Sequence, residues 1–147
     1  MQNNIARKLA QIPADHLIVG VDPHKRMHAI TVMTQQAVIC TKVKIRNSLH
    51  GFEHLMEIVQ SETTKVGALG VIFAIEAGGH YWRNLSYYLH ERGIEFRLIN
   101  PFTLKRQREG EDLTRRKNDY RDATAAAELL RTGKFAETRL LEGIMPN

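Results

Sequence analysis

The sequence has very little cysteine and no long hydrophobic run. Cys40 is the single cysteine among 147 residues, so no disulfide can form within the chain. The longest apolar stretch, Val66–Ile75, contains two glycines and is well short of the roughly 18 residues that a membrane span needs. Neither a signal-peptide pattern nor a low-complexity segment is present. These absences predict a single cytoplasmic domain with no membrane partner and a core that needs no disulfides.

Positive charge is in excess, with a net charge of +5 and a pI near 9.6. Such a balance weakly favours an anionic partner. The position of the charge is more informative, because basic residues gather in the segment that follows Pro101. They are Lys105, Arg106, Arg108, Arg115, Arg116, Lys117 and Arg121. We interpret this segment as a site for nucleic-acid phosphates; a solvated linker or helix face is an equally open alternative.

Apolar runs separated by turn residues predict an α/β order of elements. The predicted strands are Leu17–Asp22, Ala29–Thr34, Ala37–Ile45, Val71–Ile75 and Ile94–Ile99. The first predicted helix is capped by Asn47 or Ser48 and has an apolar stripe at Phe52, Leu55, Met56 and Val59. Three further helices are predicted over Tyr81–Arg92, Pro101–Arg108 and Asp119–Thr132. The order β-β-β-α-β-α-β-α is that of the ribonuclease H-like (RuvC-like) fold, a mixed five-stranded sheet with flanking helices. We expect this domain over residues 17–135, with a lead-in over 1–16 and a tail over 136–147.

Four acidic residues carry the chemistry that the sequence predicts. Asp22 and Glu76 each follow an apolar strand, so they belong at the carboxyl edge of the sheet, where open α/β folds bind their ligands. Asp119 and Asp122 are three residues apart, which places them on one helical face, and the apolar residues that continue this face predict that both carboxylates point inward. Poorly hydrated carboxylates that lie together need a cation, and Mg²⁺, with Mn²⁺ as substitute, suits oxygen ligands.

With these residues assigned, the chain resembles the amino-terminal domain of the DEDD transposases of insertion sequences, of the IS-one-ten type, which are related in fold to the Holliday-junction resolvase RuvC. The resemblance rests on four motifs. They are VGVDPHK at Val19–Lys25, IEAGGHYW at Ile75–Trp82, LINP at Leu98–Pro101 and KNDYRDA at Lys117–Ala123.

The resemblance implies that Asp22, Glu76, Asp119 and Asp122 are the catalytic metal ligands of an enzyme that cleaves and transfers DNA strands. It also implies an RNA encoded by the element as guide, and a serine nucleophile on a second, C-terminal domain, whereas the sequence ends at Asn147. Base pairing would then read the sequence while the protein holds the nucleic-acid backbones. We also expect a homo-oligomer.

Two other functions stay open at this point. An actin-like ATPase half shares the strand order, but it needs glycine-rich phosphate loops, and Asp22 is followed by Pro-His-Lys. A non-catalytic scaffold for oligomerisation and RNA binding is the other alternative, and metal binding at the carboxylates discriminates it from an enzyme. His24 and His28 flank a turn and are interpreted as surface residues.

Overall fold

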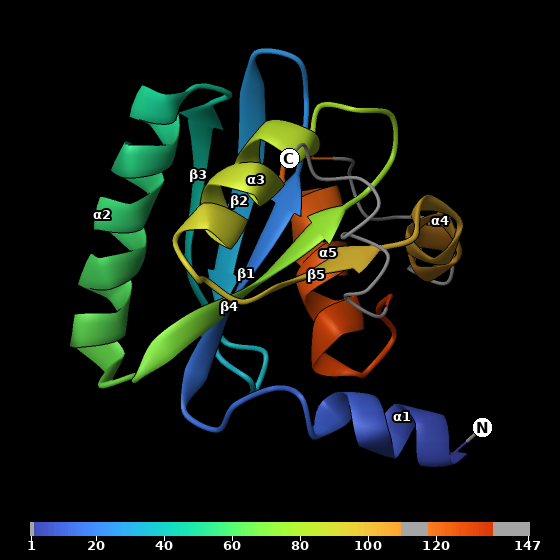
Figure 1. Ribbon diagram of the computed structural model, residues 1–147. Helices are drawn as coiled ribbons and strands as arrows, with labels where there is room; N and C mark the ends of the chain where they lie inside the picture. Colours follow the sequence, from blue (N-terminus) through green and yellow to red (C-terminus); the bar gives the residue numbers. More distant parts are fainter. Residues whose placement is uncertain (1, 110–117, 137–147) are drawn as a thin grey trace.

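Five strands form one mixed sheet in the computed structural model, which describes residues 2–109 and 118–136. Their spatial order is β3-β2-β1-β4-β5 (Figure 1). Strand β1 pairs antiparallel with β2, and β2 with β3, whereas β4 pairs parallel with both β1 and β5. The strands are β1 (His16–Asp22), β2 (Met27–Met33), β3 (Ile39–Arg46), β4 (Gly70–Glu76) and β5 (Phe96–Ile99). The predicted order of elements and the predicted neighbours β1 and β4 are confirmed.

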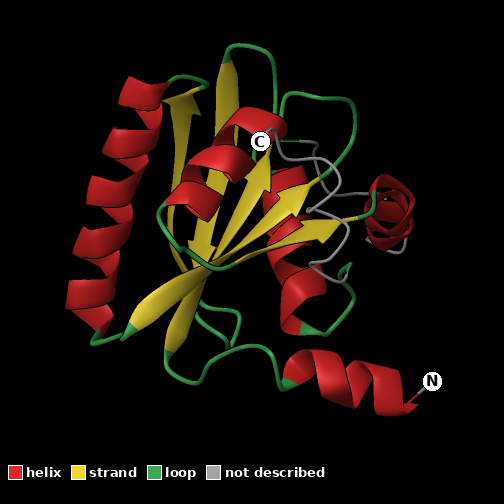
Figure 2. Cartoon of the chain, viewed as in Figure 1, coloured by secondary structure: helices red, strands yellow, loops and turns green. Residues whose placement is uncertain are grey.

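Helices cover both faces of the sheet, which gives three layers (Figure 2). Apolar side chains of α2 and α3 pack on one face, and those of α4 and α5 pack on the other. The helices are α1 (Gln2–Leu9), α2 (Leu49–Val66), α3 (Arg83–Glu91), α4 (Pro101–Glu109) and α5 (Arg121–Arg131). No helix in the two described ranges is long and apolar enough to cross a membrane.

Strand β1 lies in the middle of the sheet and is buried on both faces. Leu17, Val19 and Val21 pack toward α2 and α3, while Ile18 packs toward α5. This is why the strand reads as a continuous apolar run rather than as an alternation of apolar and polar residues. Because side chains alternate along a strand, Asp22 belongs to the same face as Ile18 and is therefore directed to the α5 side.

The termini of α2 have the expected chemistry. The Ser48 hydroxyl accepts a hydrogen bond from the Gly51 backbone N–H at 3.1 Å, so Ser48 rather than Asn47 is the N-cap. Gly67 closes the helix with φ of +73°, a conformation that suits glycine because it lacks a Cβ atom. The helix is thereby fixed in length between β3 and β4.

Most predicted boundaries differ from those observed by one or two residues, and three of them show why. Helix α3 begins at Arg83 instead of Tyr81, strand β5 begins at Phe96 instead of Ile94, and α5 begins at Arg121 instead of Asp119. A turn directly precedes each of the two helices, and two residues without regular structure precede β5, and apolar periodicity alone does not locate these segments. The predicted tail lies outside the described residues from position 137 onward.

Candidate metal and nucleic-acid site

Asp22 and Glu76 lie side by side at the carboxyl edge of the sheet. Val21 pairs with Ile75 in the parallel register of β1 and β4, and the two acidic residues follow directly. From β1 the chain turns to β2 on one side, and β4 leads to β5 on the other, so the topology reverses between these two strands. Such a reversal opens a crevice at the carboxyl ends of the strands, as the sequence predicts.

Helix α5 brings a third carboxylate, that of Asp122, to this edge. The helix lies so close to β1 that a Cβ atom on Gly20 would overlap the backbone oxygen of Ala123. A hydrogen bond of 3.0 Å between the hydroxyls of Thr31 and Thr124 joins the first turns of α5 to β2. Glycine at position 20 therefore allows the approach that places Asp122 beside the strand ends.

The three carboxylates influence one another electrostatically. Burial raises the pKa of Asp22 above its usual 3.8, and the neighbouring charge of Asp122 raises it further. Burial also raises the pKa of Glu76, and the charge of Asp22 adds to this effect. Three partners work against the rise: the His24 ring lies 2.9 Å from Asp22 Oδ2, the charge of Arg108 lowers the pKa of Asp22, and the Gly78 backbone donates to Glu76. The group is therefore short of positive charge.

Asp119 does not join this group, contrary to the expectation that it points inward beside Asp122. The Asn118 side chain accepts the Tyr120 backbone N–H at 2.9 Å, which makes a turn and delays the helix to Arg121. The Asp119 side chain is 71% exposed and pairs with Lys44 Nζ at 2.6 Å. The lysine lowers the pKa of Asp119. Asp119 thus stands at the rim, although it lines the same cavity as Asp22 and Asp122.

The predicted basic segment is only partly described. Arg108 Nη1 lies 3.2 Å from Asp122 Oδ1, and Arg121 donates to the Arg108 backbone oxygen at 3.1 Å. These two residues therefore hold α4 against the start of α5. Lys105 and Arg106 are exposed on α4. The remaining predicted residues, Arg115, Arg116 and Lys117, lie outside the described residues.

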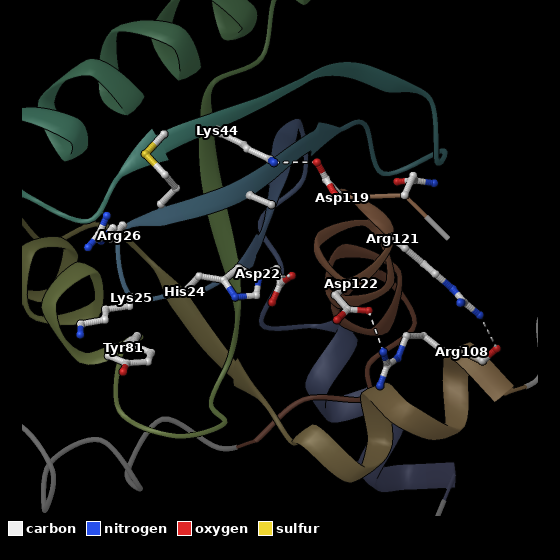
Figure 3. Close-up of a pocket in the computed structure, with 13 residues that line it drawn as sticks. Asp22, His24, Lys25, Arg26, Lys44, Tyr81, Arg108, Asp119, Arg121 and Asp122 are labelled. Carbon is white, nitrogen blue, oxygen red and sulfur yellow. Dashed lines mark hydrogen bonds and ion pairs between the residues drawn. The ribbon is translucent and has the colours of Figure 1, made fainter. Parts of the chain in front are cut away.

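A cavity of about 860 Å³ opens beside the carboxylates (Figure 3). Its lining combines acidic side chains with basic ones from β3, α4, α5 and the β1–β2 loop. The lining residues are Asp22, His24, Lys25, Arg26, Met27, Ala29, Lys44, Tyr81, Arg108, Asn118, Asp119, Arg121 and Asp122. Sequence reasoning missed the basic residues Lys25, Arg26 and Lys44. The signal for Lys44 is the alternation of basic and apolar residues along the predicted strand Ala37–Ile45.

The interpretation of both histidines as surface residues is wrong for His28. His24 is exposed, whereas His28 is fully buried on β2, where its ring stacks on Phe52. His28 Nδ1 accepts the His24 backbone N–H at 3.1 Å. Burial lowers the pKa of His28 to about 4, so its ring is neutral and supports the loop that carries His24. Its place beside Ile30 and Val32 in the strand alternation was the available signal.

The donor chemistry fits a hard divalent cation, because three carboxylates with mutual repulsion are the ligands that Mg²⁺ and Mn²⁺ prefer. The partners of two of these carboxylates are His24 and Arg108. In the part of the chain that the structure describes, no three acidic, histidine or cysteine side chains stand close enough to hold an ion in this arrangement. A cation would therefore bind only where Asp22 and Asp122 exchange these partners for it.

Comparison with solved structures identifies the class of fold. Thermus thermophilus RuvC in complex with a Holliday junction substrate is similar to 82% of this chain over 98% of its own length, with 14% identity and a TM-score of 0.50. A second T. thermophilus RuvC structure has 13% identity, the same coverage and a TM-score of 0.49. The chain thus has the ribonuclease H-like, RuvC-like fold.

The sequence comparison identifies the family. The pattern of the DEDD transposases of the IS110 (IS-one-ten) type, described as "Transposase", matches residues 19–144. This chain belongs to that transposase family. Among curated proteins no sequence matches the chain.

Proposed function

We propose that this chain is the catalytic domain of a metal-dependent DNA transposase, in which Asp22, Glu76 and Asp122 hold divalent cations and Asp119 completes the site. The observation that carries the proposal is the convergence of three carboxylates from β1, β4 and α5 at the topological switch point. Membership of the transposase family supports it. A RuvC relative in complex with a Holliday junction supports DNA as the substrate.

Each residue has a defined task in this proposal. Asp22 and Glu76 are fixed by strands and provide the rigid part of the site, while Asp122 arrives with α5. A bound Mg²⁺ or Mn²⁺ would neutralise the charge that develops on the scissile phosphate. Arg108 would release Asp122 and contact the phosphate backbone together with Lys105 and Arg106. The chain thus positions and neutralises the phosphate, which is most of what such catalysis demands of a protein.

Three further parts of the proposal rest on the family resemblance. The attacking hydroxyl belongs to a serine of a second domain, an RNA encoded by the element guides the choice of DNA, and the enzyme works as a homo-oligomer. In this arrangement base pairing reads the sequence, and the protein contacts backbones.

Calorimetric titration of Mn²⁺ and Mg²⁺ tests the metal site. The wild-type chain is compared with Asp22→Asn and Asp122→Asn, which keep the side-chain volume and remove the charge. Glu57→Gln is the matched control, because Glu57 is exposed on α2, on the opposite face of the sheet. We expect binding heat in the wild type and the control, and at least about tenfold weaker binding in both site variants.

Equal heats in all four proteins would overturn the metal site and favour the scaffold alternative. A cleavage assay on branched DNA in Mg²⁺ then tests the activity, with the second domain supplied in the same chain. Loss of strand cleavage in Asp22→Asn with retained DNA binding is the expected result. Cleavage that persists in Asp22→Asn would contradict the assignment of the catalytic carboxylates.

A further inference from the structure

Three basic residues alternate along the edge strand β3 on the side of the sheet that faces α5. Lys42, Lys44 and Arg46 pair across the strands with Thr31, Ala29 and Met27. All three basic side chains are exposed, because α5 packs over β1 and leaves this part of the sheet uncovered. The intervening residues, Val43 and Ile45, pack toward α2 on the opposite face. The strand therefore separates a basic face from an apolar face.

This basic row is in register with the carboxylate group. Lys44 pairs with Ala29, and Ala29 in turn pairs with Asp22. Two strand spacings separate Lys44 from Asp22, which is about 10 Å across the sheet. The small side chain of Ala29 lies between them and forms part of the cavity lining. An extended nucleic-acid strand that runs from the carboxylates toward β3 therefore passes over the small Ala29 side chain and then reaches the basic row.

The loop between β1 and β2 adds two basic residues, Lys25 and Arg26, to the same cavity (Figure 3). Asn47 fixes this loop: its backbone N–H donates to the Arg26 oxygen at 2.8 Å, and its side chain donates to the Lys25 oxygen at 3.2 Å. Buried His28 also holds the loop, because its Nδ1 accepts the His24 backbone N–H. The loop is thus braced before any ligand arrives, which lowers the cost of ordering it on binding.

We define the basic platform as Lys25, Arg26, Lys42, Lys44 and Arg46. Among the described residues, only Lys44 of this platform has a carboxylate partner, Asp119. Lysines on an edge strand also discourage pairing with other sheets. That role does not account for Lys25 and Arg26, which come from a different element and converge on the same cavity.

We propose that the basic platform binds the phosphates of the DNA strand whose scissile phosphate lies at Asp22, Glu76 and Asp122. This inference rests on the proposed function and adds a second binding surface, on the side of the carboxylates opposite α4. Single-strand DNA suits the platform because a strand can follow the basic row across the sheet edge. Lys44 has a double task, since it neutralises Asp119 and also faces the cavity.

Binding of a fluorescent 30-nucleotide single-stranded DNA, measured by anisotropy in EDTA from about 50 to 300 mM salt, tests the proposal. The test variant is Arg26→Gln with Arg46→Gln. The control variant is Lys65→Gln with Lys134→Gln, which removes the same charge from exposed positions outside the platform and the cavity. For single strands each lost phosphate contact reduces the salt slope by about 0.7. We expect the test variant to lose about 1.4 from the slope and about 20-fold in affinity at 100 mM salt.

Equal slopes and affinities in test and control variants would overturn the platform, as would absence of DNA binding by the wild-type chain. If the test variant lost affinity for an RNA of the same sequence but kept its affinity for DNA, the surface would be assigned to RNA and its assignment to DNA would be overturned. The readout does not depend on metal or cleavage. If the metal titration fails and the test variant still loses DNA affinity, the proposed function is refuted and the platform is not. Melting temperatures confirm that each variant is folded.

Discussion

Gly20 and Ala123 meet backbone to backbone: the carbonyl oxygen of Ala123 occupies the space that a Cβ atom on residue 20 would need. The contact joins the central strand β1 to the first turn of α5, and Asp122 is the residue just before it. The distance of α5 from the sheet therefore decides how near Asp122 comes to Asp22 and Glu76. Packing of the core and geometry of the carboxylate group depend on the same contact.

Substitution of Gly20 by alanine is expected to push α5 away from β1. Overpacking of this kind costs about 1 to 3 kcal/mol of unfolding free energy. Because Asp122 moves with the helix, Mn²⁺ affinity should fall as well, which chemical denaturation and calorimetry measure. The control is Ile72→Val, which costs about 1 kcal/mol in the same side of the core without touching the helix start. Unchanged Mn²⁺ affinity in Gly20→Ala would refute the link between this contact and the site.

Replacement of Asp22 by asparagine should stabilise the metal-free protein. The folded-state pKa of Asp22 lies above its usual 3.8, so the ionised form is disfavoured by folding and stability is lost as the pH rises through that window. At pH 7 in EDTA we expect Asp22→Asn to gain about 1 kcal/mol, or about 3 °C in melting temperature.

Mn²⁺ should reverse this order, because a ligand that binds only the folded wild type stabilises it by mass action. Thermal melts of both proteins with EDTA and with Mn²⁺ measure the reversal. A variant that melts below the wild type in EDTA would contradict the charge repulsion that we infer. At a pH below the folded-state pKa the difference in EDTA should vanish.

Buried His28 should make stability fall in mild acid. Its pKa is about 4 in the folded protein against 6.5 usually, so unfolded chains bind the proton first and stability is lost as the pH falls from about 6.5 to about 4. The loss should approach about 2 to 3 kcal/mol. Protonation also removes the acceptor for the His24 backbone N–H. Urea denaturation at several pH values should show this slope in the wild type and a shallower one in His28→Asn; parallel curves would count against the role of His28.

Arg108→Met should separate metal binding from nucleic-acid binding. Arg108 pairs with Asp122 and competes with a cation for that carboxylate, so its removal should tighten Mn²⁺ binding by about two- to fivefold, the value of a partly exposed ion pair. DNA affinity should decrease in the same variant, because α4 loses a positive charge that we propose contacts phosphate. Calorimetry and anisotropy provide the two readouts. If the Mn²⁺ affinity and the DNA affinity of Arg108→Met both rose or both fell, the exchange of partners at Asp122 would be excluded.

Sequence reasoning predicted most of the fold because the informative residues act locally. The apolar run of β1, the alternation in β3 and the cap at Ser48 each follow from neighbouring residues. The placement of Asp22 and Glu76 on neighbouring strands required only the predicted topology, and the pairing confirms it.

The features that the sequence did not indicate depend on contacts between distant segments. Asp119 is exposed and pairs with Lys44, which lies 75 positions away in sequence, and the turn at Asn118 delays the helix. The role of Arg108 at Asp122 depends on how α4 docks on α5. No short-range pattern encodes such encounters. His28 is different, because the alternation of side chains along β2 indicated that it is buried. The interpretation of His24 and His28 as residues flanking a turn overlooked this signal.

Helix α5 covers the core and also delivers Asp122, and it is the last of the described elements along the chain. During synthesis the strands that carry Asp22 and Glu76 leave the ribosome first. The carboxylate group cannot assemble until residues up to Arg131 have emerged and docked. The cation site that we propose is therefore complete only when this domain is complete, so an unfinished chain carries no assembled carboxylate group.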